Sequence, residues 1–297
     1  MQNTPLEFTI TRENYSDELT ETVVENPDDY TGALIVPQTI NFSDAEYNVT
    51  GIGYEAFWYC TRLTSITIPE GVKNIGERAF YNCSSLTAIT IPTSVTSIGG
   101  DAFYGCSKLT SITIPSNVTS IGNGAFSGCS SLTAITIPES VTTIGNGVFS
   151  GCSSLTAIII PTSVTSISDN AFRDCSSLSS ITIPEGVTSI SAGVFYGCTS
   201  LTSISLPENA ASIGDEAFKD CKNLVSISLP EKIEVIGRNT FMGCDKLASI
   251  TIPEGAISIG NDAFKDCSNL ASVTIPNTVK SIGEGALWAC RKLESIV

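Results

Sequence analysis

Residues 63–85 have the sequence LTSITIPEGVKNIGERAFYNCSS, and copies of this stretch fill most of the chain. Its cysteine marks the period, because the 11 cysteines from Cys60 to Cys290 follow one another at intervals of 23 residues. No loop insertion interrupts this spacing. A fixed period of this length predicts a solenoid, in which one small unit stacks on copies of itself.

The repeat sets the predicted domain boundaries. Ten full repeats cover residues 63–292, and a truncated repeat covers 293–297. Residues 34–62 form an irregular first repeat, because Pro37 precedes Phe57 by 20 residues where the regular copies have 11. We expect an insertion around residues 41–48. The acidic residues 1–33 fall outside the pattern, and we expect them to cover the open apolar end of the stack, as terminal caps do.

Each repeat contains the elements of one coil. The pattern Leu-x-x-Ile-x-Ile predicts a short strand, and the proline after it ends the strand because proline has no amide hydrogen to donate. The later Ala-Phe-x-x-Cys segment has the spacing of about one helical turn. The expected fold class is therefore an α/β solenoid with short helical turns. Its interior positions in the first full repeat are Leu63, Ile66, Ile68, Val72, Ile75, Ala79, Phe80 and Cys83.

Composition excludes several classes of function. The chain of 297 residues has no histidine, which excludes Ser-His-Asp and Cys-His catalysis and histidine zinc sites. We therefore expect neither an enzyme nor catalytic residues. The net charge of −15, with no basic stripe, argues against nucleic acid and anionic membrane surfaces as partners. No apolar run reaches the ~20 residues of a membrane span, and residues 1–40 lack the pattern of a signal peptide.

The cysteine ladder invites an interpretation as disulfides or as a metal array. Cysteines in adjacent coils would lie ~4.8 Å apart but point the same way, which keeps their Cβ atoms farther apart than the ~3.8 Å of a disulfide. Their number is odd, and the chain has no Cys-x-x-Cys motif. We therefore predict buried free thiols that act as small core residues, with no metal and no cofactor.

Aromatic residues form one candidate ligand site. The residue after the buried phenylalanine should point outward, and in the first three repeats it is Trp58, Tyr81 and Tyr104, with Tyr59 alongside. Such a row could hold a sugar ring or a peptide, since aromatic side chains are frequent anchors of binding. The alternative is that the rings pack against residues 1–33 as part of the cap. Trp288 occupies the same position near the other end.

The exposed face of the predicted strands is a second candidate surface. Its positions are mostly small hydroxyl residues, which suit a solvated strand and could also form a shallow contact surface for a protein or glycan. We expect it to be energetically weaker than the aromatic row. The candidate contact residues are Ser65, Thr67, Thr90, Ser111, Thr113 and Thr136.

Asparagine and aspartate recur in the turns. A calcium site is one interpretation, but the Gly-Gly-x-Gly-x-Asp pattern of calcium β-rolls is absent. We expect these side chains to cap the short helical turns instead. The residues are Asn123, Asn146, Asp169, Asp215 and Asn261.

The unit Leu-x-x-Ile-x-Ile-Pro-x-x-Val-x-x-Ile-Gly-x-x-Ala-Phe-x-x-Cys resembles the BspA-like class of leucine-rich repeats over about 260 residues. The resemblance implies a right-handed solenoid with a parallel sheet along one face, and it carries over no catalytic residues. Ser168 and Ser191 depart from the motif by replacing the turn glycine, and Leu287 replaces the phenylalanine.

Proteins of this class are typically surface or secreted proteins associated with adhesion to host matrix proteins. The resemblance thus implies a non-catalytic protein at the cell surface or secreted, with a host or matrix protein as ligand. A carbohydrate-binding module that uses the aromatic row is the alternative. The sequence stops within a repeat, and from the exposed strand edge we also expect end-to-end self-association of this chain.

Overall fold

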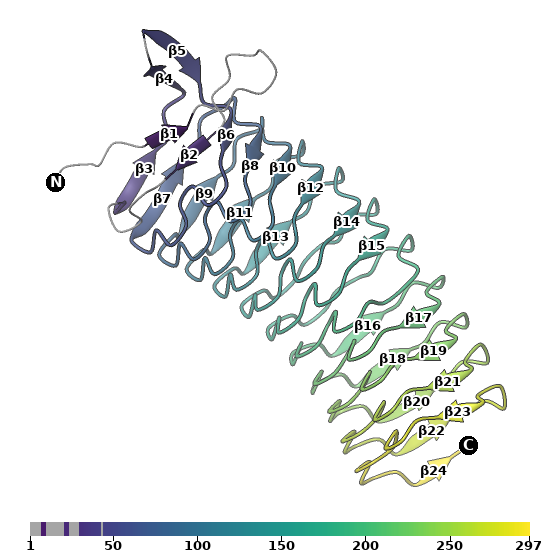
Figure 1. Cartoon of the computed structure of the whole chain (residues 1–297). Helices are drawn as coiled ribbons and strands as arrows, with labels where there is room; N and C mark the ends of the chain where they lie inside the picture. The colour runs from purple at the N-terminus through teal and green to yellow at the C-terminus, as the bar shows by residue number, and fades with distance from the viewer. Residues whose placement is uncertain (1–6, 10–20, 24–29, 43) are drawn as a thin grey trace. The chain divides into compact units, whose positions relative to one another are not determined.

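The computed structural model describes residues 7–9, 21–23, 30–42 and 44–297. It divides into two compact units, residues 1–141 and 142–297, which we describe separately (Figure 1). Each unit is a β-solenoid of stacked coils joined by parallel pairing. Together the units contain about 11 turns of the leucine-rich-repeat type, as the sequence predicts.

Unit 1 contains mostly short strands, two in each regular coil. They are β1 (Glu7–Thr9), β2 (Glu21–Val23), β3 (Gly32–Ile35), β4 (Thr39–Phe42), β5 (Ala45–Asn48), β6 (Gly51–Ile52), β7 (Leu63–Thr67), β8 (Asn74–Ile75), β9 (Ala88–Thr90), β10 (Ser97–Ile98), β11 (Ser111–Thr113), β12 (Ser120–Ile121) and β13 (Ala134–Thr136). The first strands of the coils form parallel sheets β3-β7-β9 and β11-β13, and the second strands form β6-β8-β10-β12. Two antiparallel pairs, β1-β2 and β4-β5, stand apart from this pattern.

Unit 2 repeats the arrangement of parallel sheets. Its strands are β14 (Thr143–Ile144), β15 (Ser166–Ile167), β16 (Ser203–Ser205), β17 (Ser212–Ile213), β18 (Ser226–Ser228), β19 (Val235–Ile236), β20 (Ser249–Thr251), β21 (Ser258–Ile259), β22 (Ser272–Thr274), β23 (Ser281–Ile282) and β24 (Ser295–Ile296). They form the parallel sheets β14-β15, β16-β18, β20-β22-β24 and β17-β19-β21-β23.

The stacking register equals the sequence period. Ile66 on β7 pairs with Ile89 on β9, which is the equivalent residue of the next repeat. All eight predicted interior positions of the first full repeat are buried, with no more than 5% of any of them exposed. Phenylalanine rings of successive coils stack face to face; the centroids of Phe80 and Phe103 lie 5.2 Å apart with an interplanar angle of 5°. This confirms the predicted apolar interior.

The predicted short helical turns are wrong, since the described part of the chain contains no helix. In the Ala-Phe-x-x-Cys segment the backbone amides alternate between two kinds of partner. The Tyr81 amide donates within its own coil to Arg78 O at 3.0 Å, whereas the Phe80 amide donates to Ala102 O of the next coil at 2.7 Å. Arg78 and Asn82 have φ values of 55° in the left-handed region, which interrupts a helix every fourth residue. The segment is thus a pair of tight turns that adds a third row of hydrogen bonds between coils.

The turn glycine keeps adjacent coils close. A Cβ atom on Gly99 would lie 2.4 Å from the amide nitrogen of Glu77 in the preceding coil, which is far inside van der Waals contact. Only glycine allows this approach without a shift of the backbone.

The insertion in the first repeat is the hairpin β4-β5, drawn in dark purple in Figure 1. At the start of the stack, Tyr30 is buried and meets Phe57 edge to face, with ring centroids 6.1 Å apart. Tyr30 therefore covers the first ring of the phenylalanine stack. Most of the predicted cap, residues 1–33, lies outside the described residues.

Candidate functional site

Four aromatic side chains of unit 1 form a connected surface, which we call the aromatic platform: Trp58, Tyr59, Tyr81 and Tyr104. The ring centroids are 4.3 Å apart for Trp58 and Tyr59, and 5.9 Å apart for Tyr59 and Tyr81. Tyr81 and Tyr104 stack 4.7 Å apart with an interplanar angle of 6°. Trp58, Tyr59 and Tyr104 are exposed by 36–42%, and Tyr81 is half-buried. The sequence analysis predicted that Tyr59 lies beside the row. In the structure its ring is part of the row, because it contacts both Trp58 and Tyr81.

Charged side chains flank the platform. Arg78 forms an ion pair with Glu55 at 3.3 Å, lies 3.8 Å from an Asp101 carboxylate oxygen, and donates to the Tyr54 hydroxyl at 3.3 Å. The hydrogen bond to Glu55 is the largest cause that raises the pKa of Arg78, so its charge is retained. Burial, followed by the neighbouring Tyr104 and Tyr59, raises the pKa of Tyr81, so its hydroxyl stays neutral. The platform is thus an uncharged ridge bordered by paired charges.

The predicted sheet-face residues are brought together by the parallel ladders. Ser65 and Thr67 lie on β7, with Thr90 next to Thr67 on β9. Ser111 and Thr113 lie on β11, and Thr136 pairs with Thr113 on β13. Ser65 is half-buried and the other five are exposed. They form a flat surface of small side chains without an aromatic or charged anchor.

The cysteines are free thiols, ten of them buried and Cys290 half-buried, as the sequence predicts. Each thiol for which a contact is resolved donates to the carbonyl oxygen of the phenylalanine 26 residues earlier; the distance from Cys221 Sγ to Phe195 O is 3.1 Å. Burial raises the pKa of the Cys129 and Cys221 thiols well above the ordinary cysteine value. A protonated, buried thiol is a poor nucleophile and a poor metal ligand.

This arrangement predicts strongly selective thiol chemistry. When the folded chain is treated with iodoacetamide at neutral pH, we expect only Cys290 to be alkylated, because the other ten thiols are buried. Mass spectrometry would detect one adduct, against 11 for the chain in denaturant. Rapid addition of several adducts to the folded chain would contradict the structure.

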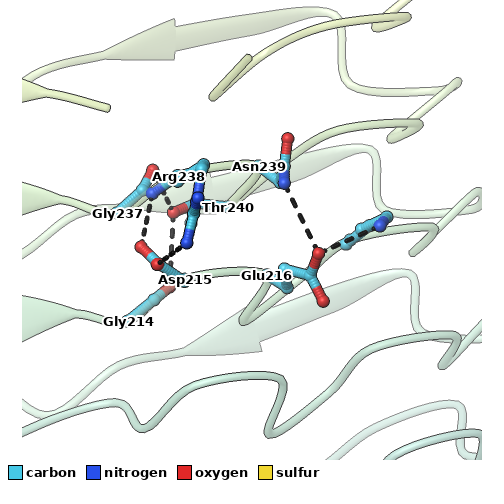
Figure 2. A network of polar contacts seen from close by, with 8 residues as sticks. Gly214, Asp215, Glu216, Gly237, Arg238, Asn239 and Thr240 are labelled. Atoms are coloured by element: carbon cyan, nitrogen blue, oxygen red, sulfur yellow. Dashed lines mark hydrogen bonds and ion pairs between the residues drawn. The ribbon is translucent and has the colours of Figure 1, made fainter. Parts of the chain in front are cut away.

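The prediction that the turn Asn and Asp side chains cap short helical turns is wrong, since the described part of the chain contains no helix. Asp169, Asp215 and Asn261 each accept from a backbone amide of the next coil, 23 residues later. In Figure 2, for instance, Asp215 Oδ1 accepts from the Arg238 amide at 2.7 Å while Oδ2 pairs with the Arg238 guanidinium at 3.2 Å. These side chains therefore join coils rather than hold calcium.

The same region contains the buried polar residue Thr240. Its hydroxyl lies 2.8 Å from Gly237 O, to which it donates, and 3.3 Å from Gly214 O (Figure 2). Beside it, Glu216 accepts from Lys219 at 3.0 Å. The buried Thr240 hydroxyl is thus satisfied within the protein, and the network links the turns of adjacent coils.

Unit 2 carries cation–π contacts that the sequence analysis missed. Arg173 lies 4.0 Å and Lys219 5.1 Å from the centroid of the Tyr196 ring, and Lys265 lies 4.6 Å from that of Trp288. All five residues occupy the same outward position of the repeat, directly after the phenylalanine or, for Trp288, after the leucine that replaces it. Reading this position along the whole chain, rather than over its first repeats, would have revealed the alternation of cations and rings.

Cysteine, aspartate and glutamate side chains are spread over the residues that the structure describes. Among them, no group of three Cys, Asp or Glu side chains is arranged to hold a metal ion. Nor does any described segment form a helix with the length and hydrophobicity of a membrane crossing.

Comparison with known proteins agrees with the repeat. A family model described as BspA type Leucine rich repeat region matches residues 50–179, 97–215 and 165–294. The chain is 32% identical to a leucine rich cell surface protein from Faecalibacterium prausnitzii, with 100% of this chain and 93% of that one covered and a TM-score of 0.60. It is 30% identical to a leucine-rich repeat protein from Bacteroides ovatus, with coverage of 100% and 94% and a TM-score of 0.53.

The pneumococcal vaccine antigen PcpA has a similar structure, with a TM-score of 0.70 over 100% of this chain and 86% of that one. At 23% identity this similarity concerns the fold alone. No curated protein matches the chain.

Proposed function

Because the chain belongs to the family of BspA-type leucine-rich repeat proteins, we propose that it is a non-catalytic binding protein whose ligand is another protein, contacted through the aromatic platform. The family is typically non-catalytic. By analogy with the cell surface protein of F. prausnitzii, we place this chain at the cell surface or outside the cell, where it would adhere to host or matrix proteins.

The observation that carries the proposal is the exposure of four aromatic rings in mutual contact. Tyrosine and tryptophan dominate the energetic centres of protein interfaces, because they bury large areas at a small cost in conformational entropy. The platform concentrates them at the surface, with tyrosine hydroxyls available at the ring edges. The sheet face has no comparable anchor.

The backbone of Tyr59 supports a role in binding. Its φ of 56° lies in the left-handed region, which glycine, asparagine or aspartate occupies at most equivalent positions of the other coils. A bulky residue there costs roughly 1–2 kcal/mol. Strain of this kind often marks functional positions. In this structure it places the Tyr59 ring between Trp58 and Tyr81.

The stacking favours a protein ligand over a sugar. A sugar ring packs on the open face of an aromatic ring, but Tyr81 and Tyr104 cover one face of each other at 4.7 Å. What remains accessible is mainly the ring edges and hydroxyls, which suit the side chains and backbone of a protein. The outer face of Tyr104 is where a glycan would stack in the alternative function.

The test is binding to immobilised fibronectin and fibrinogen, measured for the wild-type chain and for a Trp58→Ala, Tyr81→Ala, Tyr104→Ala variant. We expect the triple variant to bind at least about 30-fold more weakly, the equivalent of losing one interface hot spot of about 2 kcal/mol. The three side chains lie at the surface, outside the phenylalanine stack and exposed or half-buried, so the thermal unfolding curve should change little.

A Thr90→Ala, Thr113→Ala, Thr136→Ala variant is the matched control for the sheet face. Loss of binding in this control alone would move the site to the sheet face and overturn the proposal. Failure of the wild-type chain to bind either protein, together with saturable binding of soluble glycans that Tyr104→Ala abolishes, would replace it with the carbohydrate-binding alternative.

A further inference from the structure

Most coil boundaries in unit 2 are closed by the same pair of backbone hydrogen bonds. The amide of the turn glycine donates to an isoleucine carbonyl of the preceding coil, as from Gly214 to Ile190 O at 2.8 Å and from Gly237 to Ile213 O at 3.0 Å. A second amide bond, such as that from Ala211 to Thr188 O at 3.0 Å, lies three residues earlier. Together these bonds hold the second strands of adjacent coils in one sheet.

The boundary between coil 155–177 and coil 178–200 lacks both bonds among the described residues of unit 2. There the turn residue is Ser191, and its hydroxyl, rather than its backbone amide, donates to Ile167 O. The strand β15, which contains Ile167, pairs with β14 but with nothing in the following coil. Ile190 keeps only an isolated bridge to Ile213 on its other side. In Figure 1 no strand arrow is drawn between β15 and β16.

Side-chain volume explains this separation. A Cβ on Gly214 or Gly237 would lie 2.7 Å from a backbone nitrogen of the preceding coil, so the regular spacing does not admit a side chain. Ser191 has a Cβ and stacks on Ser168, which also lacks the glycine of the motif. A glycine at either level suffices to keep the bond, since the Ser168 amide still reaches Ile144 O at 2.9 Å. Where Ser191 stacks on Ser168, neither level has a glycine, and the backbone bond is lost.

Val194 adds bulk in the same coil, where most repeats have alanine. A void of about 10 Å³ lies at this boundary, lined by apolar side chains that include Ile167, Ile190 and Phe195. Side chains beside a void lose dispersion contacts on that side, which weakens the packing between the two coils.

The opposite side of the boundary is intact. The amides of Asn170, Phe172 and Asp174 donate to carbonyl oxygens of the next coil at 2.9, 3.0 and 2.7 Å. The first strands also keep an isolated bridge from Ala157 to Ser180. The coils are thus tied along their row of tight turns, whereas their second strands lack backbone pairing and are joined only through side chains, by the Ser191 hydroxyl on Ile167 O and by Asp169, which accepts from the Ala192 amide at 3.0 Å.

We propose that this boundary is a hinge at which residues 142–177 and 178–297 of unit 2 change their mutual angle. The row of turns is the pivot, and the second strands are the edge that opens. The packed coils on both sides move as rigid bodies. This conformational property goes beyond the proposed binding function and does not depend on it, because it rests on the backbone of unit 2 alone.

Hydrogen exchange of the wild-type chain, read residue by residue by NMR, tests the hinge. The amides of Thr188 and Ser191 should exchange at least about 100-fold faster, after correction for intrinsic rates, than those of Ala211 and Gly214 at the next boundary, because local opening exposes them. Equal protection at the two boundaries would overturn the proposal without any variant being made.

A pair of variants separates the hinge from a general weakness of the region. Ser168→Gly with Ser191→Gly restores the motif and should slow exchange at residues 188 and 191 by at least about tenfold. Gly237→Ser with Gly260→Ser builds serine on serine at a regular boundary and should accelerate exchange at residues 257 and 260. If the first variant leaves exchange unchanged while its circular dichroism spectrum is native, the serines do not make a hinge.

Discussion

We expect the folded chain to lose stability steeply as the pH rises above about 8.5, the ordinary pKa of cysteine. Eight thiols have a pKa well above that value in the folded protein. Burial is the largest cause of the raised pKa for seven of them. For Cys83 the largest cause is a hydrogen bond with Cys60, followed by burial. The eight thiols are Cys83, Cys106, Cys129, Cys175, Cys198, Cys221, Cys244 and Cys267.

The direction follows from proton linkage. A group whose pKa is raised by folding contributes stability that is fully present below its unfolded pKa and is lost as the pH rises toward its folded pKa. Above about pH 8.5 the unfolded chain releases these eight protons while the folded chain retains them. At about 1.4 kcal/mol for each proton and pH unit, the free energy of unfolding should fall by about 11 kcal/mol per pH unit. That exceeds the stability of many domains, so alkaline unfolding near pH 9.5 is expected.

Urea unfolding between about pH 7.5 and 9.5 in the presence of a reductant measures this slope. A Cys221→Ala, Cys244→Ala variant is the matched control, since it removes two of the eight protons and should reduce the slope by about a quarter. A free energy of unfolding that stays constant over this range would mean that the thiols ionise in the folded protein. That result would contradict their burial.

Much of the fold could be predicted from the sequence, because the period alone fixes which residues stack. Phe80 must lie against Phe103 in any solenoid of this repeat, and their rings do stack. The prediction of a helical turn in the Ala-Phe-x-x-Cys segment was wrong, because the spacing of apolar residues does not distinguish a helix from paired turns. The signal was nevertheless present: Gly124 and Gly128, four residues apart, both adopt left-handed φ values. Glycine at this spacing indicates turns, since it is a poor residue for a helix interior.

The candidate site was predicted less completely. The phase of the repeat identifies which residues point outward, and Trp58, Tyr81 and Tyr104 are at least partly exposed. The phase cannot show that the Tyr59 ring enters the row, because this depends on a left-handed backbone that is rare for tyrosine. In the sequence, the hinge corresponds only to two departures from the motif, Ser168 and Ser191. Whether these serines break the pairing of the second strands depends on the distance between coils, which the sequence does not give.

The phenylalanine stack should dominate the packing energy, and we expect Phe218→Ala to lower the free energy of unfolding by about 3–5 kcal/mol. Phe218 is fully buried, and its ring lies 5.4 Å from those of both Phe195 and Phe241. Truncation would leave a cavity between two flat rings that are fixed by the hydrogen bonds of their own coils. Urea unfolding monitored by circular dichroism gives the loss directly.

Phe218→Leu is the informative comparison, because the chain itself has leucine at the equivalent position 287. Leucine fills more of the cavity, so its loss should be no more than about half of that for alanine. Since coils interact mainly with their neighbours, hydrogen exchange in Phe218→Ala should accelerate most in the coils around Phe195 and Phe241. A loss for Phe218→Ala smaller than that for Phe218→Leu would mean that the adjacent rings close the gap. In that case the stack would be deformable, and the stability of each coil would come from its hydrogen bonds.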